Sequence, residues 1–279
     1  MGGETSDMSK QDATARPGIA PTSRPTAGPM FAALYGERET PVTPARHDAY
    51  QLFHQRSLAM GWLDDRPGGD EESAAPGLWG MNDAGWDHPP AAPGADLIAW
   101  FQVEASAPAD DRPLPVQPFL RCAQEVTERA GAVRLTAVQV LLPVRGIDAS
   151  ARPPHTRVPS LRTQDWFGTG DPGARVPVRV RVDGGLDPSI PAAARQFARA
   201  LVDQQVFAGT LDEHAGPEGF PAPPFDDRFW NGPPRHGMTL SGELAEWSCD
   251  AIGWLAATTA DATAALGIAA PVLFTVVRA

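Results

Sequence analysis

The sequence predicts an α+β fold, with helices over one face of an antiparallel sheet. Runs with apolar residues at alternate positions, typical of strands, are interspersed with runs that repeat every three to four residues, typical of helices. Without the loops, these runs follow the order β-α-β-β-α-β with one extra helix. This is the element order of a ferredoxin-like sheet with helices on one face.

The domain prediction rests on length and local composition. At 279 residues, the chain is long enough for one domain with a large core. Residues 1–42 are rich in glycine, proline, serine and threonine and are predicted to form a flexible arm, with residues 30–35 as its one apolar patch. Residues 43–279 are predicted to form a single α+β domain. Within it, residues 43–95 supply a helix and a tryptophan-containing loop, and residues 96–279 supply the sheet and the other helices.

The first half of this domain contains the clearest amphipathic helix. Thr43 and Pro44 fit the N-cap and the first position of a helix that runs to about residue 60. A long loop is predicted from residue 64 to residue 95. The elements predicted after it are a strand at 97–104, the amphipathic helix at 115–130 ending at Gly131, and a strand at 133–144.

The second half is predicted to end in a helix followed by a buried strand. Valines alternate with arginines through residues 175–183, which predicts a half-buried strand, and Pro177 favours an edge position because it cannot donate a ladder hydrogen bond. Ser241 is the predicted N-cap of a helix that ends near Gly267. The other predicted elements are a helix at 188–207, a short strand at 236–240 and a last strand at 271–278.

One face of the predicted sheet has no helix to cover it. It would expose more apolar surface than a soluble domain leaves in water, namely Trp100, Val138, Val140, Leu142 and Leu273. We therefore expect cover from the N-terminal helix, from the tryptophan-bearing loops or from a second subunit.

Charge and composition narrow the class of partner. The net charge is −11, which disfavours a general nucleic-acid binder, and Lys10 is the only lysine, which fits a GC-rich bacterial genome. No apolar run reaches the ~20 residues of a membrane span, and the N-terminus lacks the pattern of a signal peptide. Cys122 and Cys249 are expected to be buried thiols. We predict a cytoplasmic protein with no nucleic-acid or membrane partner.

Two loops share an unusual composition. Residues 78–90 and 225–236 each contain tryptophan, asparagine, histidine and a Pro-Pro pair. They either meet at one site, as products of a duplication, or plug the ends of the sheet. Arg175, Arg179 and Arg181 lie on one face of a strand, where they either bind an anion or carboxylate, form a solvent-exposed surface, or pair with the acidic segments. The candidate ligand- or partner-binding residues are Trp79, Trp86, Trp100, Trp230, Asn231, Arg179 and Arg181.

Candidate acid–base residues for catalysis are His88, His236, Asp226 and Asp227. The histidine spacing matches no compact metal motif, and the sequence has no phosphate-binding loop or nucleophile elbow. No metal or cofactor is therefore predicted.

The favoured hypothesis is a non-catalytic protein that binds a protein partner or assembles with itself through the apolar sheet face and the tryptophan loops. The alternative is a small-molecule enzyme, for example one of secondary metabolism. Its pocket would lie between the sheet and these loops and would use the histidine and aspartate candidates.

Overall fold

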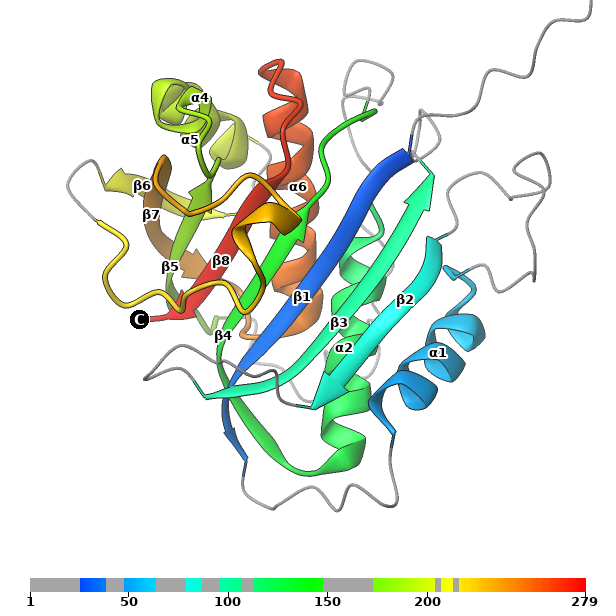
Figure 1. Ribbon diagram of the computed structural model, residues 1–279. Coiled ribbons are helices and arrows are strands. Elements are labelled where there is room, and N and C mark those ends of the chain that lie inside the picture. Colours follow the sequence, from blue (N-terminus) through cyan, green and yellow to red (C-terminus); the bar gives the residue numbers. More distant parts are fainter. Residues whose placement is uncertain are drawn as a thin grey trace, which may run out of the picture.

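A computed structural model describes residues 26–38, 48–63, 79–86, 96–106, 113–147, 173–203, 207–212 and 216–279. Their strands form one antiparallel sheet of eight strands, with the α-helices on one face (Figure 1). The predicted mixture of helices and an antiparallel sheet is confirmed. The predicted ferredoxin-like sheet is not confirmed, because the strand order of the whole sheet differs.

The chain repeats one succession of elements. Its first half is β1 (Thr26–Arg38), α1 (Ala49–Met60), β2 (Trp79–Trp86), β3 (Leu97–Ser106), α2 (Val116–Ala130) and β4 (Val133–Leu142). Its second half is β5 (Val176–Asp183), α4 (Ser189–Ala192), α5 (Ala194–Asp203), β6 (Ala208–Asp212), the short 3-10 helix η2 (Asp227–Phe229), β7 (Gly237–Leu244), α6 (Cys249–Ala265) and β8 (Val272–Arg278). The sheet order is β2-β3-β1-β4-β8-β5-β7-β6. Read inward from its own edge, each half therefore has its second, third, first and fourth strand in that order. The halves join where β4 pairs with β8, with Gln139 opposite Thr275.

The main core lies between the sheet and the helices. Alternate residues of the four central strands enter it: Met30, Ala32 and Leu34 of β1, Val138, Val140 and Leu142 of β4, Val178, Val180 and Val182 of β5, and Val272, Phe274 and Val276 of β8. Large side chains from the helices pack on them, among them Phe53, Phe119, Phe197, Ile252 and Leu255. Each fully buried side chain of this size contributes roughly 1.5–3 kcal/mol.

This core corrects the predicted composition of the uncovered sheet face. Val138, Val140 and Leu142 face the helices, so β4 presents Ala137, Gln139 and Leu141 to the other side. The prediction was correct for Leu273, which lies opposite Leu141 in the sheet. It was also correct for Trp100, which packs with Phe31 and Tyr35 on the side of the sheet away from the helices. The error came from the facing of β4, since both of its faces are apolar.

The largest correction concerns β1. Its residues were predicted to belong to the flexible arm, but Thr26–Arg38 lies between β3 and β4 in the interior of the sheet. Residues 30–35 are apolar at every position, as an interior strand covered on both faces requires. Strand β2 was likewise missed, because it lies within the predicted loop at 64–95.

Several element boundaries also differ. Ser241 belongs to β7, and the last helix begins after Ser248, whose Oγ accepts a hydrogen bond from the amide of Ala251 at 3.1 Å. Strand β5 is interior rather than an edge; Pro177 is tolerated near its start. The first helix is capped by Asp48, whereas Thr43 and Pro44 lie outside the described residues.

Other predictions hold or need smaller changes. The predicted helix at 188–207 is two helices, and strand β6 follows it. Strand β3, helix α2 with Gly131 at its end, and strand β8 are confirmed. Gly267 follows the last helix with φ +77°, as predicted for a helix C-terminus. No helix in the described part of the chain is long and apolar enough to cross a membrane.

Candidate functional site

The non-helical face of the sheet carries a second apolar cluster. It consists of Phe31, Ala33, Tyr35, Leu97, Ala137, Leu141 and Val277, with Trp100 packed against it. Residues 216–236, which we call the strap, join β6 to β7 and cross this face over β8 and β4 (Figure 1). Phe220, Phe225, Phe229 and Trp230 of the strap pack on the cluster.

Phe31 is the centre of the aromatic contacts. Its ring meets Phe225 edge-on with centroids 4.9 Å apart, and it meets Phe229 edge-on at 6.0 Å. On its other side, Trp100 lies parallel to it, with centroids 5.7 Å apart and 3° between the planes. Such pairs contribute about 0.5–1.5 kcal/mol each beyond their area. The aromatic surface therefore continues from the strap across β1 to β3.

Hydrogen bonds from the sheet hold the middle of the strap. Tyr35 Oη donates to the carbonyl oxygen of Ala222 at 3.2 Å, and Gln139 Nε2 donates to the carbonyl oxygen of Pro221 at 3.2 Å. Burial raises the pKa of Tyr35, which keeps its hydroxyl protonated as a donor. Gln139 Nε2 also donates to Thr275 Oγ1 at 3.0 Å, where β4 meets β8.

Both ends of the strap are tied to β5 or to the turn after it. Near the start, Arg179 donates to the carbonyl oxygen of Glu218 at 3.2 Å, and its guanidinium lies 4.8 Å from the centroid of Phe220. Near the end, Asn231 Nδ2 donates to the carbonyl oxygen of Gly184 at 3.0 Å. Gly185 has φ +66°, and a Cβ there would lie 1.8 Å from the carbonyl oxygen of Asn231. Glycine is therefore required for this approach.

A buried ion pair occupies the polar part of the face. Arg181 and Asp183 lie two residues apart on β5, and Arg181 Nη2 donates to Asp183 Oδ2 at 2.7 Å, with the side chains 9% and 2% exposed. Asp183 Oδ1 also accepts from the amide of Gly185 at 2.8 Å. Gly237 makes room on β7, since a Cβ there would lie 2.5 Å from Asp183 Oδ2. The two charges therefore neutralise each other within the fold.

A cavity of about 600 Å³ opens where the strap meets the sheet. Tyr35, Ala137 and Val277 line it on the sheet side, and Phe220, Pro221 and Ala222 line it on the strap side. Its rim carries charges of both signs, from Glu37, Asp96, Arg179 and Arg278. Glu37 is paired with Arg134 at 2.5 Å. A small polar or zwitterionic molecule would fit these surroundings.

The structure does not bring the predicted acid–base residues to this cavity. His236 and Asp226 lie on the strap, and Asp226 caps η2 by accepting from the amide of Arg228 at 2.8 Å. Asp226 and Asp227 are exposed, and none of these three candidates lines the cavity. His88 lies outside the described residues.

The predicted binding residues fall into two groups. Arg179, Arg181, Trp230, Asn231 and Trp100 all belong to the non-helical face or the strap. Trp86 packs on the helical side, where the guanidinium of Arg38 lies 5.6 Å from its ring, and Trp79 begins β2. The sequence prediction did not include Phe31, Tyr35, Gln139 and Asp183 among the candidate site residues, although Phe31 and Tyr35 belong to the apolar patch at 30–35. For Gln139, the available signal is a lone glutamine between valines.

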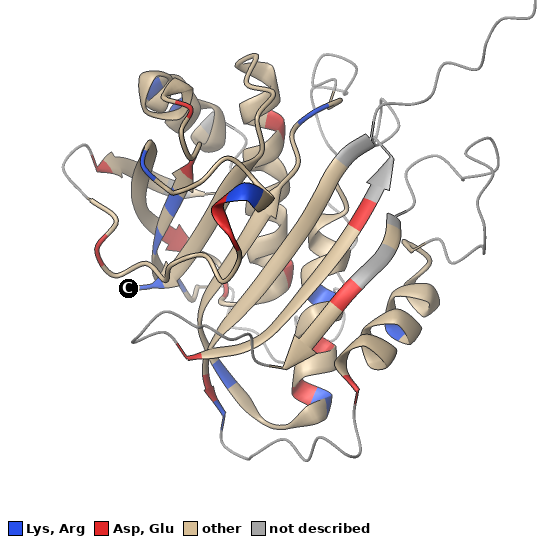
Figure 2. Ribbon diagram, in the orientation of Figure 1, with Lys and Arg blue, Asp and Glu red and all other residues tan. Residues whose placement is uncertain are grey.

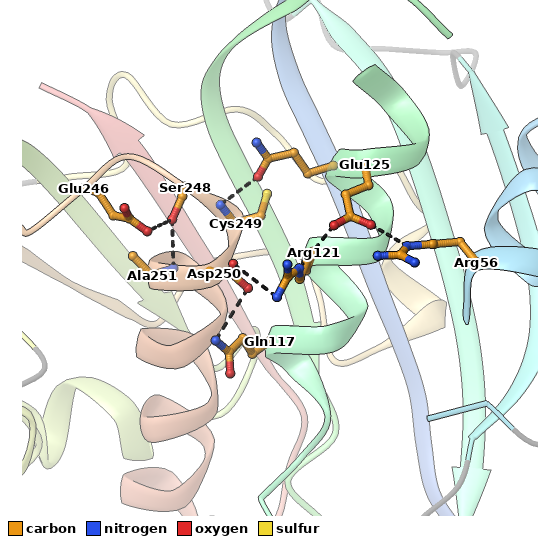
Figure 3. A network of polar contacts seen from close by, with 10 residues as sticks. Arg56, Gln117, Arg121, Glu125, Glu246, Ser248, Cys249, Asp250 and Ala251 are labelled. Atoms are coloured by element: carbon orange, nitrogen blue, oxygen red, sulfur yellow. Dashed lines mark hydrogen bonds and ion pairs between the residues drawn. The ribbon is translucent and has the colours of Figure 1, made fainter. Parts of the chain in front are cut away.

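A second polar cluster ties the helices together (Figure 3). Arg56 of α1 pairs with Glu125 of α2, and Arg121 bridges Glu125 at 3.2 Å and Asp250 of α6 at 3.9 Å. Burial would raise the pKa of Glu125, but hydrogen bonds from Arg56 and Arg121 outweigh it and lower that pKa. Burial raises the pKa of Asp250, and Arg121 partly offsets the rise. The cluster joins the helices of the two halves.

The two thiols are not prepared for nucleophilic chemistry. Burial raises the pKa of the Cys122 thiol to about 11, and it also raises the pKa of Cys249. Within the described ranges, no three histidine, cysteine, aspartate or glutamate side chains gather as a metal site would require.

Comparison with known proteins adds no assignment. No protein-family model matches the chain, and neither a curated protein nor a solved structure matches it.

Proposed function

We propose that this protein acts by binding a protein partner without catalysing a reaction, and that the partner docks on the non-helical face where Trp100 lies beside the strap. One observation carries the proposal: the aromatic surface centred on Phe31 is covered by Phe225 and Phe229 on one side, but continues to a partly exposed Trp100 on the other. Aromatic side chains of this kind are enriched at protein–protein interfaces and anchor them.

The use of the polar groups supports binding over catalysis. Arg181 and Asp183 neutralise each other, and Gln139 and Tyr35 hold the strap. A catalytic acid or base needs a proton that it can exchange with a substrate. The hydrogen bonds of these groups instead stabilise the fold. The buried thiols suit a protein that works in the reducing cytoplasm, which is part of the proposal.

The chain is further interpreted as a tandem of two ferredoxin-like units joined through β4 and β8. In each half the strand order is second, third, first and fourth, and the helices follow the first and third strands. Each such unit has one face without helices. The tandem thereby creates a wide non-helical face, of which the strap covers the centre.

The test compares complexes formed in the cells that make the protein. Tagged wild-type and Trp100→Ala chains are purified gently, and their native mass spectra are recorded. We expect a stoichiometric protein partner on the wild type that is largely lost from Trp100→Ala. The matched control is Phe220→Ala, which removes an aromatic ring at the other end of the strap and should keep the partner. A wild-type chain that carries no protein, or a partner that survives Trp100→Ala, would contradict the proposal.

The cavity favours a second candidate, a small-molecule enzyme. Its lining includes Tyr35, Arg179 and Arg278. The same spectra distinguish the two functions, because an added mass of a few hundred daltons, without a protein, would indicate an occupied cavity. Loss of that mass on Arg179→Ala would then assign the ligand to this place.

A further inference from the structure

We infer that the partner seated beside Trp100 presents a cationic segment rich in arginine or lysine. The inference rests on the proposed binding function and names the chemistry of the partner. It concerns the β2–β3 strip, which we define as the non-helical face formed by Asp83, Gly85, Trp100, Gln102 and Glu104. The alternation of β3 sets this facing, since Phe101 and Val103 belong to the helical core. The register places Asp83 opposite Gln102 and Gly85 opposite Trp100.

The charges of the strip have one sign. Strands β2 and β3 contain Asp83 and Glu104, both exposed, and neither lysine nor arginine. Figure 2 shows these acidic positions on the two strands that face the viewer, without basic residues on either strand. Complementary charge across an interface speeds association and excludes wrong partners.

Trp100 adds a surface suited to a cation. A Cβ at Gly85 would lie 2.5 Å from Trp100 Nε1, so the indole lies across the glycine of the neighbouring strand. The ring is also parallel to Phe31, which holds it in place. Trp100 is partly exposed, and tryptophan is the best aromatic for an interaction with a guanidinium or ammonium group. The carboxylates of Asp83 and Glu104, together with the Trp100 ring, favour a cationic segment that also contains apolar residues.

The same charges argue against a second copy of this chain as the occupant. Two copies meeting through the strip would bring Asp83 and Glu104 of each protomer together, and like charges at an interface are costly. The net charge of −11 adds general repulsion between copies. The occupant is therefore a different, basic chain.

The test uses the full chain and two fluorescently labelled peptides, one in which arginine and valine alternate and one with glutamate in place of arginine. Binding is followed by fluorescence anisotropy at low and physiological salt. We expect the arginine peptide alone to bind, more weakly at higher salt. Asp83→Asn with Glu104→Gln should weaken it by about fivefold to tenfold, as the loss of two exposed ion pairs implies.

A matched variant controls for net charge. Asp226→Asn with Glu243→Gln removes two exposed carboxylates outside the strip, one on the strap and one on β7, and should change the affinity less than about twofold. Thermal unfolding checks that both double variants fold. If Trp100→Ala abolishes binding but the strip and control variants behave alike, the site stands and the cationic inference is wrong. If neither Trp100→Ala nor the strip variant has an effect, the site itself is wrong. No binding of the arginine peptide up to about 1 mM, or equal binding of the glutamate peptide, would also overturn the inference.

Discussion

The two halves of the chain share one core but differ on the opposite face of the sheet. They can be matched at Gly36, near the end of β1, with Gly184, directly after β5. They can also be matched at Gly131 and Gly267, which follow α2 and α6. The helical faces then agree, because Met30, Ala32 and Leu34 take the positions of Val178, Val180 and Val182. The other faces do not, because Phe31, Ala33 and Tyr35 take the positions of Arg179, Arg181 and Asp183.

The difference shows which positions packing dictates and which it leaves open. Both helical faces must bury the main core, so both are apolar. The other face has no helix, and each half solves its cover differently. In the second half, the buried Arg181–Asp183 ion pair occupies this face, and Arg179 and Gly184 hold the ends of the strap. The first half supplies rings on which the strap packs, and leaves Trp100 partly exposed.

The largest expected effect comes from breaking the ion pair of the second half. Asp183→Ala leaves Arg181 buried without its partner and should lower the free energy of unfolding by about 3–5 kcal/mol, as measured by urea denaturation. The double variant Arg181→Ala with Asp183→Tyr installs the residues of the first half. It should recover much of the loss, because no uncompensated charge remains. A single variant as stable as the wild type would show that the two faces do not differ in this way.

A smaller loss is expected where the helices of the two halves meet. A Cβ at Gly253 of α6 would lie 2.6 Å from the Cα of Gln117 in α2, and the backbone cannot move aside cheaply. Gly253→Ala should therefore lower the stability by about 3 kcal/mol, the upper end of overpacking costs. Ala251→Ser, at a partly exposed position of the same helix, is the control and should change little. Equal thermal midpoints for the two variants would contradict this close packing.

The smallest effect tests how the first half holds the strap. Tyr35→Phe removes the hydrogen bond to Ala222 but keeps the ring, and should cost about 1 kcal/mol in thermal or urea unfolding. The exposed Ala222 carbonyl can turn to water, which limits the loss. A cost above that of Asp183→Ala would reverse the order proposed for the two halves.

Strong periodicity made part of the fold predictable. Helix α2 has a clean polar and apolar division, and β8 is an apolar run between Gly267 and the end of the sequence. Strand β1 escaped prediction because its apolar residues follow a segment rich in proline and threonine, which indicates an arm. Strand β2 contains glycine, asparagine and aspartate, which are rare in strands, and its pairing with β3 supplies what local preference lacks.

The candidate site was predictable only in pieces. The alternation of valine and arginine in β5 predicts that Arg179 and Arg181 share one face. The composition of the loop at 225–236 indicates Trp230 and Asn231 as candidates. Nothing local connects Phe31 with Phe225, which lie far apart in sequence and meet only because the strap crosses the sheet. The sequence also did not determine which face of β4 points to the helices, because the residues on both faces of this strand are apolar.

Carboxyl footprinting of the wild-type chain with and without the arginine–valine peptide, read residue by residue by mass spectrometry, tests directly which half binds. Asp83 and Glu104 on the first half and Glu243 on the second are all exposed carboxylates of the non-helical face. We expect the peptide to protect Asp83 and Glu104 from modification and to leave Glu243 unchanged. Protection of Glu243 alone, or of all three equally, would contradict the claim that the open first half is the binding half.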